Sequence, residues 1–113
     1  MAFLKCTVTN KTASGPVATE GGYLFGLLIG SDYTNDPIVS LYDNPSAAAG
    51  DEIIPTTKVD ASAFGMNGFM PGTVAIPFDY GMYLSLTVGG GGSAEVLIYY
   101  RLKSDDLPSK GVR

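Results

Sequence analysis

Apolar and polar residues alternate along residues 81–102, on both sides of a run of four glycines. Before the glycines, every second residue from Met82 to Val88 is apolar. After them, one face holds Ala94, Val96, Ile98 and Tyr100, and the other holds Glu95, Leu97, Tyr99 and Arg101. A period of two is typical of β-strands. The segment therefore predicts two strands in a hairpin with a flexible glycine loop, and the second strand carries apolar side chains on both faces.

Short alternating or apolar segments, separated by breaks rich in Gly, Pro, Asn and Asp, fill the rest of the chain. These breaks are typical of turns. We expect further strands at residues 2–9, 23–30, 38–42, 52–59 and 73–78, and a turn over residues 10–16. The first of these strands places Val8 on a modest apolar face.

Several residues refine these expectations. Residues 23–30 are apolar on both faces, which predicts a central strand, and its glycines indicate bulges or a close approach of another backbone. Pro55 lacks an N–H group, so residues 52–59 form an edge strand or an extended crossover. Asn67-Gly68 predicts a turn because both residues tolerate positive φ. The segment at residues 60–64 has room for one helical turn, which Asp60 would cap.

The spacing of these strands, without a convincing helix, predicts an all-β protein. We expect a single small antiparallel β-sandwich, jelly-roll-like, with about seven or eight strands. At 113 residues the chain has room for one domain. Residues 1–102 form the expected sandwich, and residues 103–113 form a polar tail.

Composition points to association. Charged residues make up only 16% of the chain, against about 25% in ordinary soluble proteins. Large side chains on strands whose other face is also apolar are candidates for contacts between copies. The predicted self-association residues are Tyr23, Phe25, Tyr83, Leu97 and Tyr99.

Charge and hydropathy exclude several partners. Seven basic residues are scattered among eleven acidic ones, for a net charge of −4, so no positive face for nucleic acid is expected. The longest apolar run, residues 23–29, is shorter than the roughly 20 residues that cross a bilayer. No secretory signal is evident at the start of the sequence. These features predict a protein that binds neither nucleic acid nor membrane.

The chain contains no histidine and a single cysteine, Cys6. Catalytic triads and transition-metal sites are therefore excluded, and Cys6 is expected to be a small buried residue. Calcium at residues 31–36 is less favoured than ordinary Asx turns, because the spacing lacks the distal glutamate of an EF-hand. The four glycines precede a strand and not a helix, which argues against a phosphate loop. We expect no catalytic, cofactor-binding or metal-binding residue and no enzyme activity.

Three segments together resemble small virion proteins of tailed bacteriophages: Leu41-Tyr42-Asp43-Asn44, residues 81–88 and residues 96–101. Proteins of this class include head decoration, or cement, proteins. The resemblance implies a virion structural protein on the capsid surface, made in the host cytoplasm, that forms a homotrimer and binds adjacent major capsid protein subunits to stabilise the head.

An alternative from the same resemblance is a receptor- or glycan-binding module of a phage tail fibre or baseplate. That function predicts that the loops at residues 31–37 and 89–92 cluster at one end of the domain. Tyrosines near these loops would then contact the ligand.

Overall fold

The computed structural model describes residues 6–61, 67–69 and 75–106. This part of the chain contains nine β-strands and a short 3₁₀ helix. The strands are β1 (Thr7–Lys11), β2 (Gly15–Ala18), β3 (Gly22–Ser31), β4 (Pro37–Tyr42), β5 (Glu52–Lys58), β6 (Asn67–Phe69), β7 (Ile76–Phe78), β8 (Met82–Val88) and β9 (Ala94–Leu102). The helix, η1 (Lys103–Asp106), follows β9 directly.

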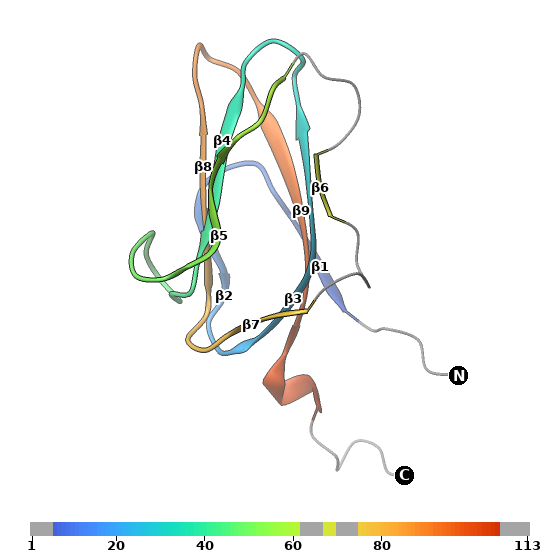
Figure 1. Cartoon of the computed structure of the whole chain (residues 1–113), viewed down its shortest axis with the longest axis vertical. Helices are drawn as coiled ribbons and strands as arrows, with labels where there is room; N and C mark the ends of the chain where they lie inside the picture. Colours follow the sequence, from blue (N-terminus) through green and yellow to red (C-terminus); the bar gives the residue numbers. More distant parts are fainter. Residues whose placement is uncertain (1–5, 62–66, 70–74, 107–113) are drawn as a thin grey trace, which may run out of the picture.

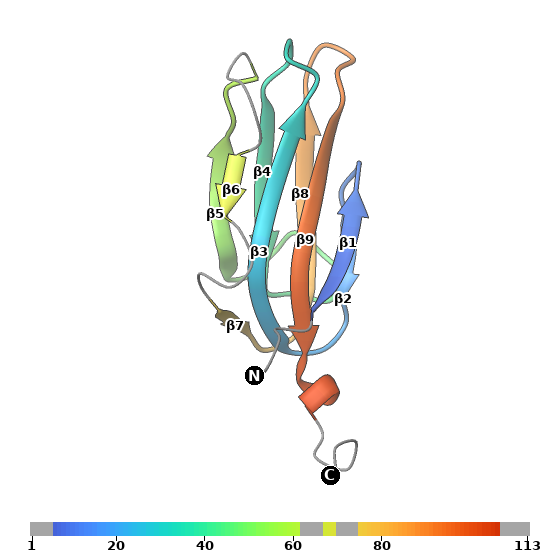
Figure 2. The same ribbon diagram turned by 90° about the vertical axis from the view of Figure 1, so that its right-hand side faces the viewer.

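The strands form two antiparallel sheets that face each other (Figure 1). Sheet A has the order β1-β9-β3-β6, and β7 also pairs with β3, farther along the same strand. Sheet B has the order β2-β8-β4-β5. Figure 2 shows β3 and β9 side by side at the centre of sheet A, with β1 on one side and β6 on the other. The prediction that residues 23–30 form a central strand is therefore confirmed.

The pairing follows the nested scheme of a jelly roll. The first strand pairs with the last, β2 pairs with β8, β3 pairs with β6 and β7, and β4 pairs with β5. The resulting ribbon is rolled up so that β3 meets β9 and β4 meets β8. If β6 and β7 are counted as one interrupted strand, the fold is an eight-stranded sandwich. The predicted fold class is confirmed.

The core lies between the sheets and is built from alternate residues of the long strands. Its fully buried side chains include Leu24, Val39, Leu41, Phe78, Met82, Leu84, Val96 and Ile98. Burial of each such side chain contributes about 1.5–3 kcal/mol to stability. Tyr100 also points inward, and its hydroxyl donates to the carbonyl of Val17 at 3.4 Å. The inward faces predicted for residues 82–88 and 94–100 are the ones buried here.

A bulge interrupts the alternation in β3. Leu24 lies opposite Tyr100 and Gly26 opposite Tyr99, so Phe25 is an extra residue in the ladder. The insertion places both Leu24 and Leu27 in the core, although they are three residues apart. It leaves Phe25 on the outer face, where its ring centroid is 6.5 Å from that of Tyr23. The bulge expected in this glycine-containing strand is present.

The predicted hairpin at residues 81–102 is wrong in its pairing. Strands β8 and β9 belong to different sheets, and their apolar faces meet across the core. The glycine loop therefore crosses from one sheet to the other. Alternation identifies a buried face equally well in a hairpin and in a sandwich, so it could not distinguish the two arrangements.

The start of the chain also differs from expectation. Residues 2–5 of the predicted first strand lie outside the described residues. The predicted turn over residues 10–16 is shorter than expected, because β1 continues to Lys11 and β2 begins at Gly15. Val8 lies on the outer face of sheet A, opposite Tyr99, and is 50% exposed. Thr7 and Thr9 take the inward register instead, opposite the buried Tyr100 and Ile98.

Asn67-Gly68 is not a turn: both residues belong to β6, and Gly68 lies opposite Leu28. The glycine is needed for a close approach, because a Cβ built on Gly68 would lie 1.8 Å from the carbonyl oxygen of Leu27. Pro55 lies in the edge strand of sheet B, as predicted. The helical turn expected at residues 60–64 and the start of the strand at residues 73–78 lie largely outside the described residues.

The Leu41–Asn44 segment fastens the lower end of the sandwich. The Asp43 carboxylate accepts backbone hydrogen bonds from Asp79, Tyr80 and Gly81, at 2.9, 2.7 and 3.3 Å. These bonds join the end of β4 to the turn before β8. Asn44 accepts from the N–H groups of Ser46 and Ala47 and so shapes the next turn. Residues 41–44 are therefore linked to the start of the 81–88 segment by turn-forming hydrogen bonds.

Replacing Gly68 with alanine should destabilise the protein more than replacing Gly50. Both glycines have positive φ, at 129° and 91°, which costs an L-residue about 1–2 kcal/mol. A Cβ at Gly50 meets nothing within 4 Å, whereas one at Gly68 meets backbone. We expect Gly68→Ala to lower the free energy of unfolding by at least about 1 kcal/mol more than Gly50→Ala, as measured by urea denaturation. Equal losses would contradict the close approach of β6 to β3.

Candidate functional site

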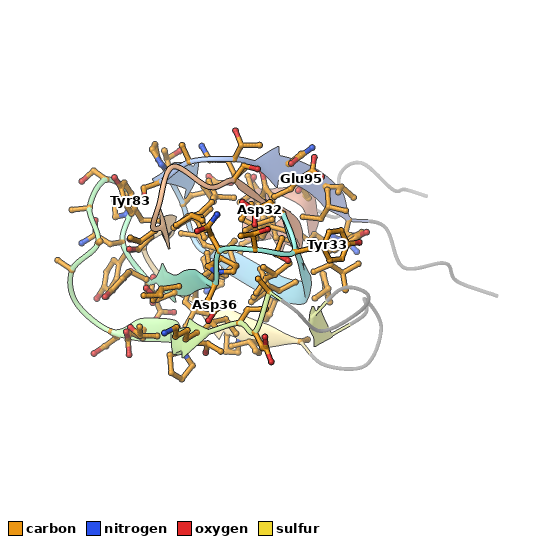
Figure 3. All side chains as sticks on the ribbon, turned by 90° about the horizontal axis from the view of Figure 1, so that it is seen from above. Asp32, Tyr33, Asp36, Tyr83 and Glu95 are labelled. Atoms are coloured by element: carbon orange, nitrogen blue, oxygen red, sulfur yellow. The ribbon has the colours of Figure 1, made fainter. Side chains whose placement is uncertain are left out.

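Four of the five predicted self-association residues lie together on the outer face of sheet A. Tyr23 and Phe25 come from β3, and Leu97 and Tyr99 come from the adjacent strand β9. All four are half-buried. The fifth, Tyr83, lies on β8 in sheet B, where its neighbours across the ladder are Pro16 and Tyr42 (Figure 3). The structure does not bring Tyr83 to the other four.

Two further residues extend this surface. Val8 on β1 lies opposite Tyr99, and Leu28 on β3 lies opposite Leu97. We call the six residues the apolar strip: Val8, Tyr23, Phe25, Leu28, Leu97 and Tyr99. The strip spans three neighbouring strands. Val8 was expected on a modest apolar face of the first strand, and the register with Tyr99 shows that this side chain belongs to the outer surface of sheet A.

Polar groups border the apolar strip. Asn10, opposite Leu97, donates through its side-chain amide to the Glu95 carboxylate at 2.5 Å. Arg101 lies opposite Tyr23 at the other end. An apolar centre with a charged and polar border is typical of surfaces that bind other proteins.

A second feature lies at the upper end of the sandwich, where Asp32 joins two loops (Figure 3). Its carboxylate accepts the backbone N–H groups of Thr34 and Asn35, which are in its own loop, at 2.9 and 2.8 Å. It also accepts the N–H of Ser93, 61 residues later, at 2.9 Å. We call residues 32–36 and 89–93 the loop end. The expected Asx turn in residues 31–36 is present, and it also anchors the glycine loop.

These donors change the acidity of Asp32. The backbone N–H groups of Asn35, Ser93 and Thr34, together with the Asn35 side-chain amide, hold the pKa of the Asp32 carboxyl well below its usual value. Hydrogen bonds to the charged form favour ionisation. The connection between the two loops is therefore a charged one over the whole neutral and mildly acidic range.

The glycine loop is a tight turn and not a flexible linker. Gly90 and Gly91 have φ values of 62° and 72°, and the N–H of Gly92 donates to the carbonyl of Gly89 at 3.0 Å. Positive φ at both central positions is the type I′ arrangement, which side chains with a Cβ rarely adopt. Backbone geometry thus explains Gly90 and Gly91, and Gly92 leaves room for the Asn35 and Asp32 side chains. The expectation of a flexible loop missed the anchoring by Asp32.

An open cavity of about 530 Å³ lies beside the loop end. Its lining combines hydroxyl groups, a carboxylate and small apolar surfaces, from Thr12, Ala13, Ser14, Gly30, Ser31, Leu86, Val88, Gly92, Ser93, Ala94 and Glu95. The size is within the usual range for ligand sites. We call it the edge groove, because it opens between the upper ends of β8 and β9.

Other titratable and thiol groups have structural contacts. The Asp36 carboxylate accepts the N–H of Ala61 at 2.8 Å and lies 3.9 Å from the Lys58 ammonium. Cys6 is half-buried, less enclosed than expected. In the described part of the chain, no group of three or more His, Cys, Asp or Glu residues is placed to hold a metal ion.

Comparisons of the chain with protein-family models, curated proteins and solved structures found no match. Within residues 6–61, 67–69 and 75–106, no helix has the length and apolar character needed to span a membrane.

Replacing Asp32 with asparagine should destabilise the protein in a pH-dependent way. The carboxyl has a lower pKa in the folded chain than in the unfolded chain, where it is about 4. Its contribution is therefore complete above about pH 4 and is lost as the pH falls toward the folded value. Urea denaturation should show a constant difference between wild type and Asp32→Asn from pH 7 to 5, and a smaller one at pH 2.

Asp51→Asn serves as the matched control, because Asp51 is exposed and its side chain makes none of the bonds described above. We expect this variant to follow the wild type at each pH. A difference between wild type and Asp32→Asn that stays the same from pH 5 to pH 2 would refute the charged connection.

Proposed function

We propose that the chain is a non-enzymatic virion structural protein, a capsid decoration or cement protein that associates with itself and binds adjacent major capsid protein subunits. The observation that carries the proposal is the apolar strip on sheet A. The resemblance of residues 41–44, 81–88 and 96–101 to tailed-phage virion proteins supplies the assignment to a virion.

The apolar strip supports association for a physical reason. Outer positions of a sandwich sheet that face water are ordinarily polar, yet here Val8, Leu28 and Leu97 occupy them beside three aromatic rings. Aromatic side chains with a polar border are enriched at protein interfaces. The strip therefore has the chemistry of a surface that is covered in the working assembly.

The free energy available from burying the apolar strip favours several contacts for each molecule over one contact between two molecules. Burying about 400 Å² of apolar surface yields about 10 kcal/mol at about 25 cal/mol per Å². Association costs about 4–15 kcal/mol in lost freedom. One contact of this size is therefore marginal, whereas a closed trimer held on a lattice makes several contacts for each molecule. This balance fits a homotrimeric decoration protein.

A second candidate function is a receptor- or glycan-binding module of a tail fibre or baseplate. The loops at residues 31–37 and 89–92 do lie at one end, joined by Asp32. Tyr33 in the first loop is 62% exposed and has positive φ, at 69°. A rigid loop pair that presents an exposed tyrosine is suited to contact with a ligand.

Replacing Leu97 with lysine should dissociate the assembly. The change places a charge at the centre of the apolar strip. Leu97 lies on the outer face of sheet A, so its replacement leaves the core between the sheets intact. We expect sedimentation velocity to show a wild-type species larger than the 11.8 kDa monomer and a largely monomeric Leu97→Lys. Circular dichroism should show the same strand content in both.

Thr87→Lys is the matched control, because Thr87 is exposed on the outer face of sheet B. It should sediment as the wild type does. Tyr83→Ala tests the fifth predicted residue: dissociation by this variant as well would mean that both sheets form interfaces. A wild type that is monomeric at micromolar concentration and does not bind capsids would rule out the proposed function.

Copy number separates the two candidate functions. A decoration protein covers the capsid lattice, so quantitative mass spectrometry of purified virions should find the chain in hundreds of copies per particle. A handful of copies would assign it to the tail and favour the receptor-binding alternative.

A further inference from the structure

The edge groove exists because the first two strands are shorter than their partners. Strand β2 reaches only as far as Leu84 of β8, through Gly15, and β1 reaches only as far as Val96 of β9, through Lys11. The turn between β1 and β2 then crosses from one sheet to the other at mid-height (Figure 1). Figure 2 shows β8 and β9 continuing well beyond it. None of the described strands lies beside their upper ends on this side.

The backbone of β8 shows how this free edge is oriented. The N–H of Leu86 donates to the Ser14 hydroxyl at 2.8 Å, and that hydroxyl donates to the carbonyl of Leu86 at 3.1 Å. The Ser14 side chain thus satisfies both backbone groups of Leu86. These groups would bond to β2 if that strand extended beyond Gly15. Because N–H and C=O groups alternate in direction along a strand, those of Val88 point the same way as those of Leu86.

In the part of the chain that the structure describes, no side chain bonds to the backbone of Val88 as Ser14 bonds to that of Leu86. The ladder neighbour of Val88 on the other side is Pro37, and the carbonyl of Pro37 already accepts the N–H of Val59 at 2.8 Å. Among the described residues, no hydrogen bond occupies the groove-facing groups of Val88. An unpaired strand edge that borders a cavity is the arrangement that accepts an added strand.

We propose that the edge groove binds an extended peptide segment, which adds to sheet B as a short strand beside the upper end of β8. Small apolar side chains at alternate positions of the peptide contact Leu86, Val88 and Ala94 at the base of the groove. A lysine or arginine of the peptide pairs with the Glu95 carboxylate at the rim.

The chemistry of the lining selects this ligand. Among the described residues, the lining of the groove contains a carboxylate and no basic side chain, which disfavours anions and favours a cationic group. The part of the lining that the structure describes also has no aromatic ring on which a sugar could stack. The Asp32 connection fixes Ser93 and the glycine turn at the upper wall, so little ordering of the protein is required on binding.

The inference does not depend on the proposed function, because none of the six residues of the apolar strip lines the edge groove, although Glu95 borders both. The strip is tested by sedimentation of the chain alone, and the groove by peptide binding. Either can fail without the other.

The test is selection from a random heptapeptide library displayed on a carrier, with the full chain as the target. We expect enriched peptides to alternate apolar residues and to carry a lysine or arginine. The enriched peptides should bind Glu95→Lys at least about tenfold more weakly. The control Glu52→Lys, which makes the same charge change on the edge strand β5, should bind them as the wild type does.

Hydrogen exchange provides a readout that only an added strand would give. The amide of Val88 should become protected when a selected peptide binds, while that of Thr87 should change little. Failure to enrich any peptide, equal binding to Glu95→Lys, or binding without protection of Val88 would each overturn the proposal. Binding of a neutral disaccharide such as maltose in the groove, with no peptide selected, would overturn it in favour of a glycan site.

Discussion

The bulge in β3 is the constraint on which the arrangement of the sandwich depends. The central strand of sheet A must place Leu24, Leu27 and Ile29 in one core, although strict alternation would send Leu27 outward. A single extra residue restores the register. The same shift turns Leu28 to the outer face, opposite Leu97 in the apolar strip. Core packing and the apolar strip are therefore two results of one irregularity.

The strand positions and the fold class could be predicted from the sequence because they depend on local patterns. The inward faces of β8 and β9 follow from alternation, and the edge position of β5 follows from Pro55. Which strands pair with each other could not be predicted in the same way. Whether β8 pairs with β9 or faces it across the core is decided by the whole set of strand pairs, and the alternation is identical in both cases.

The roles of several glycines, of Asp32 and of Val8 were the hardest features to predict from the sequence. Asn67-Gly68 has the local chemistry of a turn, yet Gly68 is needed because another backbone passes within contact distance. The four glycines suggested flexibility, but Asp32 anchors their turn from 61 residues away. Val8 gave no local sign that it faces outward, since its environment is set by Tyr99 on the last strand. In each case the deciding contact is remote in sequence.

The pairing of β1 with β9 has a consequence for synthesis on the ribosome. Residues 7–11 pair with residues 96–100, so sheet A stays open at this edge until residues 96–100 have been translated. Contacts between such distant residues make folding slow. During that interval the apolar residues of the early strands stay exposed and are available to chaperones and to other nascent copies.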